Sequence, residues 1–78
     1  MNGQRLRALR QEVGLSQEKL AERIYVTKYI IQSWEEGWHI INPSSGEIEE
    51  MAEIFGISEE QLRLEIDAPE KNDFDYEK

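Results

Sequence analysis

Apolar residues recur at intervals of three and four positions along most of the chain, which is the spacing that one buried face of an α-helix requires. No segment shows the strict alternation of apolar and polar residues that is typical of a half-buried strand. The positions that the pattern assigns to the core are Leu6, Leu9, Val13, Leu20, Ala21, Ile24, Val26, Ile31, Trp34, Ile48, Met51, Ala52, Phe55 and Leu62. We therefore expect an all-α domain.

Residues suited to helix ends divide the first half of this pattern into three helices. The first is expected from about Gly3 to Val13, followed by Gly14, which suits the left-handed conformation that closes many helices. Ser16 and Thr27 suit the N-cap positions of a second and a third helix. Only residues 25 and 26 separate these two helices, so they must cross steeply, as in a helix-turn-helix.

The second half of the pattern predicts two more helices. The segment GWHIINPSS reads as a loop, because its glycine ends one helix and its proline cannot lie inside the next. Ser44 with Glu47, and Ser58 with Gln61, have the spacing of capping boxes that start a fourth and a fifth helix. The charged, proline-containing segment DAPEKNDFDYEK predicts a flexible tail. The expected organisation is a domain over 1–66 and an acidic tail over 67–78.

The composition limits the kind of protein. A chain of 78 residues without cysteine has room for one small domain, which must fold on an apolar core without disulfides. There is no leader-like segment and no apolar run of membrane length, so a cytoplasmic protein with no membrane partner is expected.

Charge is distributed unevenly around a net value of −8. Residues 1–36 carry six arginines and lysines against five glutamates, whereas residues 37–66 carry seven glutamates against one arginine. Non-specific attraction to phosphate should therefore be weak. Nucleic-acid binding would have to come from a local face in the first half of the chain.

The inventory of reactive side chains argues against an enzyme. There is no cysteine nucleophile, no aspartate before Asp67 and no glycine-rich phosphate loop. His39 is the single histidine and has no cysteine beside it, so neither a metal site nor a cofactor site is expected. A binding module remains.

Several spaced motifs agree with one family. In order, they are RLRALRQEVGLSQEKLA, the two-residue turn YV, TKYIIQSWEEG, NPSSGEIEEMAEIFGIS and EEQL. Together they resemble the Xre-type, lambda-repressor-like and Cro-like helix-turn-helix regulators over about residues 3–65. The resemblance implies a five-helix lambda-repressor-like DNA-binding domain, with its helix-turn-helix at about residues 17–36. It also implies a transcriptional regulator of prokaryotic or phage type, whose expected partners are operator DNA and a second copy of the chain.

The resemblance places a DNA-reading surface on the third helix. Helical spacing puts Lys28, Tyr29, Gln32 and Ser33 opposite Ile31 and Trp34. Lysine and glutamine can donate hydrogen bonds to base edges, and a tyrosine ring can contact a thymine methyl. Free backbone N–H groups at helix amino ends also favour phosphate. The expected DNA-binding residues are Gln17, Thr27, Lys28, Tyr29, Gln32 and Ser33.

Acidic and apolar residues after this surface depart from the family pattern. The resemblance pairs Glu35 with Arg10 as a structural ion pair, which would keep that carboxylate from repelling DNA. At the position of Glu36 the family usually has asparagine, arginine or another residue compatible with DNA, whereas the charge of Glu36 would lie near phosphate. Basic residues often follow the glycine in the family, whereas this chain has the apolar residues Trp38, Ile40 and Ile41.

Two functions are consistent with these residues. The first is a sequence-specific, repressor-like regulator that binds a double-stranded DNA operator as a homodimer and reads the major groove with its third helix. The alternative keeps the fold and changes the partner, as in an antitoxin or anti-repressor. A protein partner would then meet the loop residues Trp38, Ile40 and Ile41 or the tail residues Phe74 and Tyr76.

Overall fold

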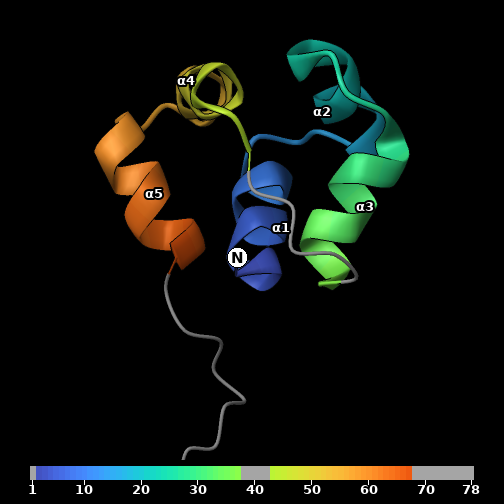
Figure 1. Ribbon diagram of the computed structural model, residues 1–78, viewed down its shortest axis with the longest axis horizontal. Coiled ribbons are helices and arrows are strands. Elements are labelled where there is room, and N and C mark those ends of the chain that lie inside the picture. Colours follow the sequence, from blue (N-terminus) through green and yellow to red (C-terminus); the bar gives the residue numbers. More distant parts are fainter. Residues whose placement is uncertain (1, 38–42, 68–78) are drawn as a thin grey trace, which may run out of the picture.

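The computed structural model describes residues 2–37 and 43–67, and these form five α-helices without a strand (Figure 1). The all-α prediction is therefore confirmed. The helices are α1 (Gly3–Glu12), α2 (Gln17–Ile24), α3 (Lys28–Glu36), α4 (Ser45–Phe55) and α5 (Glu59–Asp67). None of these five is long and apolar enough to cross a membrane.

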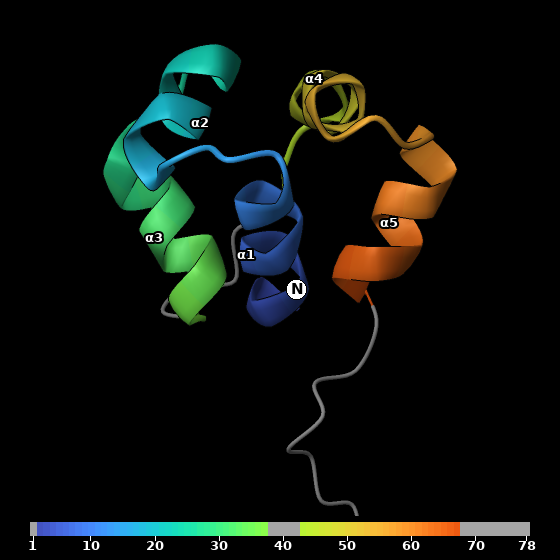
Figure 2. The same ribbon diagram turned by 180° about the vertical axis from the view of Figure 1, so that it is seen from behind.

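Helix α1 lies in the middle of the bundle, between α3 on one side and α5 on the other (Figures 1 and 2). Helices α2 and α4 lie across one end of these three. The apolar faces of all five helices meet in one core, whose fully buried members include Leu6, Leu20, Ile31, Met51 and Leu62. A backbone hydrogen bond of 2.5 Å from the N–H of Asn2 to the carbonyl of Ile66 joins the start of α1 to the end of α5.

Side-chain caps fix where the helices begin. The hydroxyls of Ser16 and Thr27 accept hydrogen bonds from backbone N–H groups in the first turns of α2 and α3. Ser44 and Glu47 form the complete capping box that their spacing predicts. At α5 only half of the expected box is present. Ser58 caps the helix, but the side chain of Gln61 donates to Glu65 instead of returning to the cap.

The end of α1 differs from the prediction. The helix stops at Glu12, and Val13 follows it as the C-cap residue with 40% of its surface exposed. Val13 was expected on the buried stripe, and that expectation is wrong because the chain leaves the helical path before Val13 can continue the stripe. Gly14, with φ of +74°, takes the left-handed conformation expected of it.

Several predicted features lie outside the described residues. The partner-surface candidates Trp38, Ile40, Ile41, Phe74 and Tyr76 belong to this group, as does His39. Asp67, which we assigned to the tail, is the last residue of α5.

Candidate nucleic-acid interface

Helix α3 buries one face and presents the other to solvent. Ile31 and Trp34 are buried against the core, whereas Lys28 and Tyr29 at the amino end are exposed and Gln32 is half-buried. Thr27 is also exposed, and its hydroxyl accepts a hydrogen bond of 3.3 Å from the N–H of Ile30. The structure thus brings four of the six expected DNA-binding residues together along the first turns of α3.

Ser33 does not share this surface. Its side chain is fully buried, and its hydroxyl donates a 2.8 Å hydrogen bond to the carbonyl of Ile30. The expectation that Ser33 lies on the outer face is therefore wrong. A short side chain satisfied by its own helix backbone cannot extend to a base edge.

Gln17 lies at the start of α2 and turns toward the scaffold. Its side-chain amide donates a 3.0 Å hydrogen bond to Oε1 of Glu35, and the residue is half-buried. One side of this amide is therefore engaged within the protein. The amide nitrogen carries a second N–H, so one donor and the carbonyl oxygen are left for a ligand.

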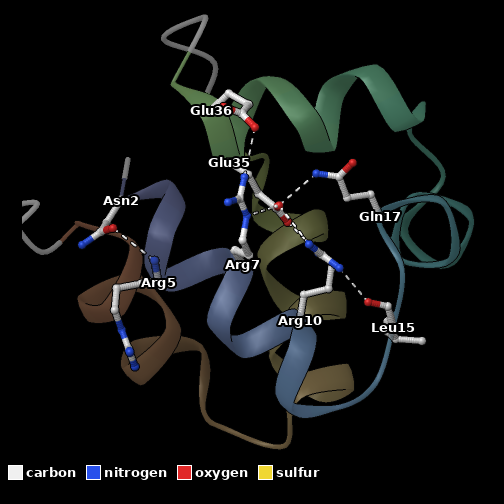
Figure 3. Close-up of polar contacts among 8 residues, drawn as sticks. All are labelled: Asn2, Arg5, Arg7, Arg10, Leu15, Gln17, Glu35 and Glu36. Carbon is white, nitrogen blue, oxygen red and sulfur yellow. Dashed lines mark hydrogen bonds and ion pairs between the residues drawn. The ribbon is translucent and has the colours of Figure 1, made fainter.

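In the last turn of α3, Glu35 is the centre of a polar cluster (Figure 3). Nε of Arg10 lies 2.7 Å from Oε2 of Glu35, and Nη2 of Arg10 lies 3.1 Å from Oε1. Nη1 of Arg10 donates a further 2.8 Å hydrogen bond to the carbonyl of Leu15, before α2. One guanidinium thus ties α1 to the last turn of α3 and to the connection that leads into α2.

Burial and hydrogen bonding act on Glu35 in opposite directions. Burial of its side chain disfavours the charged form and raises the pKa. Hydrogen bonds from Arg10, Gln17 and Arg7, together with the charge of Arg10, outweigh burial, so the pKa of Glu35 lies below its ordinary value. Glu35 is therefore a paired anion inside the scaffold and is screened from an approaching polyanion.

Glu36 has a partner that the sequence analysis missed. Nη2 of Arg7 lies 3.1 Å from Oε2 of Glu36, while Nε of the same arginine lies 3.2 Å from Oε1 of Glu35 (Figure 3). A signal was available, because Arg7 and Arg10 are three residues apart and so share one face of α1. Arg7 partly offsets the charge that Glu36 would otherwise present at the end of α3.

These pairings decide which cations remain open to a ligand. Arg5 donates to Glu65 across 2.6 Å, so all three arginines of α1 are engaged with carboxylates. Lys28 forms no ion pair or hydrogen bond through its side chain with the residues that the structure describes. An open cation is thus present at the amino end of α3, where the backbone N–H groups also favour an anion.

The opposite part of the domain is unsuited to a polyanion. A hollow of about 320 Å³ between α4 and α5 is lined by Glu49, Ala52, Glu53, Ile57, Ser58 and Glu59. Its carboxylates would repel phosphate. Residues 2–37 and 43–67 contain no group of three or more side chains arranged to hold a metal ion.

Comparison with known proteins agrees with this geometry. A family model described as helix-turn-helix matches residues 6–62 of the chain. Searches of curated proteins and of solved structures found no match. The matched range includes all of α2 and α3 and both partners of the ion pair between Arg10 and Glu35.

Proposed function

Because the chain belongs to the Xre/lambda-repressor-like helix-turn-helix family of DNA-binding regulators, we propose that it is a sequence-specific, repressor-like regulator whose α3 enters the major groove of operator DNA. Repression rather than activation, and the contacts with individual bases, are both part of what we propose.

The observation that carries the proposal is the open amino end of α3. Lys28 and Tyr29 are exposed there, and Gln32 follows one turn later on the same helix. In the proposed complex Lys28 donates to the acceptors of a guanine edge, Gln32 pairs with an adenine edge, and the ring of Tyr29 meets a thymine methyl. Thr27 and the first N–H groups of α3 lie closest to the phosphates. The buried cluster around Glu35 holds this helix in place.

A homodimer is part of the proposal. One such module covers too few base pairs to select a site in a genome, and two copies on a two-fold operator double the sequence that is read. Among the apolar residues of α5, Leu64 is available for a contact between copies, because 64% of its surface is exposed. Ile66 is 4% exposed and therefore belongs to the core of the domain.

Selection from a randomised duplex pool, at low and at near-physiological salt, tests the proposal. We expect recovery of a palindromic site that survives the increase in salt. Lys28→Ala should then weaken binding to this site by about tenfold or more and relax its sequence preference. Lys19→Ala is the matched control, since Lys19 is an exposed lysine on α2 that lies 3.8 Å from Glu22. Failure to enrich any sequence at both salts would contradict the proposal.

A protein-interaction module is the second candidate function. It is favoured by the net charge of −8 and by the engagement of Arg5, Arg7 and Arg10 with carboxylates, which leaves few cations for phosphate. In this alternative, Trp38, Ile40 and Ile41, or Phe74 and Tyr76, bind a protein. Deletion of residues 68–78 separates the two functions: operator binding should persist under the first, and binding of a protein partner should be lost under the second if the tail carries it.

A further inference from the structure

Three helices of this domain end in the same backbone arrangement, and one of them departs in sequence. After α1, α2 and α4, a residue with positive φ is followed by one whose N–H bonds the carbonyl five positions earlier: Leu15 to Arg10, Val26 to Ala21 and Ile57 to Ala52. This is the Schellman arrangement, in which glycine is preferred because it has no Cβ. Gly14 and Gly56 occupy the position after α1 and α4, with φ of +74° and +76°, but Tyr25 occupies it after α2, with φ of +62°.

Stability does not explain this tyrosine. Among the described residues, Tyr25 is the one residue other than glycine with positive φ. The residue is 91% exposed, and its side chain forms no hydrogen bond with the part of the chain that the structure describes, so packing does not compensate for the left-handed backbone. When no packing or hydrogen bond of the side chain offsets an unfavourable backbone conformation, the residue is a candidate for a functional role.

The position of Tyr25 indicates what that function is. Tyr25 lies in the turn of the helix-turn-helix, two residues before the cap Thr27 and three before Lys28. Its backbone N–H bonds the carbonyls of Ala21 and Glu22, which fixes the point from which the side chain extends. A phenol is thus displayed beside the amino end of α3, next to the proposed groove-reading surface.

We propose that the hydroxyl of Tyr25 donates a hydrogen bond to a phosphate oxygen of the DNA strand that borders the groove entered by α3. This inference rests on the proposed function and adds to it a residue that positions the domain on DNA. A phenol is a neutral donor, so it contacts phosphate without displacing a counterion and without reading sequence. In a chain with so many of its arginines paired, a neutral donor supplies a contact that an additional cation would otherwise make.

Three variants of the full chain test this role, with a fluorescent duplex recovered by the wild-type protein as the probe. Tyr25→Phe removes only the hydroxyl, and we expect binding about tenfold weaker at an unchanged melting temperature. Tyr25→Gly removes the whole side chain and relieves the backbone, so binding should weaken at least as much while the melting temperature rises. Lys28→Ala reports on the proposed function through a separate residue.

Salt and sequence dependence identify the kind of contact. For both Tyr25 variants, the slope of log affinity against log salt should equal that of the wild type, and the loss should be the same on the selected duplex and on a scrambled one. Wild-type affinity for Tyr25→Phe and Tyr25→Gly, with Lys28→Ala impaired, would overturn the inference and leave the proposed function standing. Loss for Tyr25→Gly but not for Tyr25→Phe would overturn the hydroxyl contact. If the wild-type chain recovers no duplex, the proposed function fails and the inference fails with it.

Discussion

Arg10 donates two hydrogen bonds to Glu35, of 2.7 and 3.1 Å, and so ties the middle helix of the bundle to the carboxyl end of α3. The side chain of Glu35 is fully buried and that of Arg10 is 10% exposed. Removing one partner of a buried ion pair is strongly destabilising, because the other charge stays buried and its desolvation is no longer compensated. The orientation of the proposed reading helix therefore depends on this ion pair.

Arg10→Met should lower the free energy of unfolding by about 3–5 kcal/mol, because the buried carboxylate of Glu35 loses two hydrogen bonds and the nearby positive charge. Urea denaturation followed by circular dichroism measures the change. Arg5→Met is the matched control on the same helix, since the pair of Arg5 with Glu65 is at the surface and should matter little. Equal losses for the two variants would contradict the special role of Arg10.

The lowered pKa of Glu35 predicts a dependence of stability on pH. Because the folded-state pKa lies below the ordinary value of 4.5, ionised Glu35 contributes its full stabilisation above about pH 4.5. That contribution is lost as the pH falls through the folded-state pKa, where the folded protein must also take up the proton. Urea unfolding between pH 7 and pH 3 should show this loss. The Glu35→Gln variant should have a lower free energy of unfolding than the wild type at pH 7, and that free energy should fall less on acidification. As a control, Glu53→Gln, at an exposed site on α4, should show the same pH dependence of the free energy of unfolding as the wild type.

Gly3 provides a test of the contact between α1 and α3. A Cβ added at Gly3 would lie 2.5 Å from the carbonyl oxygen of Trp34 and closer still to that of Glu35, both of them backbone atoms. Gly3→Ala should therefore push the two helices apart and cost about 1–3 kcal/mol. Gly46→Ala in α4 meets nothing within 4 Å and should gain up to about 1 kcal/mol. Thermal unfolding of the two variants should shift in opposite directions.

The pairing of Glu36 with Arg7 predicts an effect on DNA affinity. Glu36→Gln removes a carboxylate near the proposed phosphate path and releases one side of the Arg7 guanidinium. We expect tighter binding by a factor of about 2–5 at low salt, with a smaller effect at high salt because of screening. Fluorescence anisotropy against the selected duplex measures it. Glu53→Gln is the control, and an equal gain for that variant would show that only the net charge matters.

Much of the fold follows from local signals in the sequence. The caps Ser16, Thr27 and Ser44 each form the expected hydrogen bond, since an N-cap needs only its own side chain and the next turn. Helical periodicity also identified the buried stripe of α4. The predictions were wrong where contacts with nearby residues determine how a helix begins or ends. The end of α1 at Glu12 and the partial box at Ser58 both depend on competing local contacts that residue spacing does not reveal.

The candidate site was less predictable than the fold. Helical spacing alone placed Ser33 on the outer face. Spacing predicts the direction in which a side chain leaves the helix, but it does not predict whether neighbouring atoms bury that side chain. The side chains of Gln17 and Arg7 meet Glu35 only once α1, α2 and α3 are packed together. The left-handed backbone of Tyr25 could have been predicted from the sequence, because the two-residue turn between two capped helices contains no glycine.

The most direct test of the account is an amide chemical-shift titration of the labelled protein with the selected duplex, recorded by NMR. We expect the largest changes at the turn around Tyr25 and at Thr27, Lys28, Tyr29 and Gln32, with small changes along the acidic hollow between α4 and α5. Changes concentrated on α4 and α5, with α3 unaffected, would contradict the claim that the outer face of α3 reads DNA.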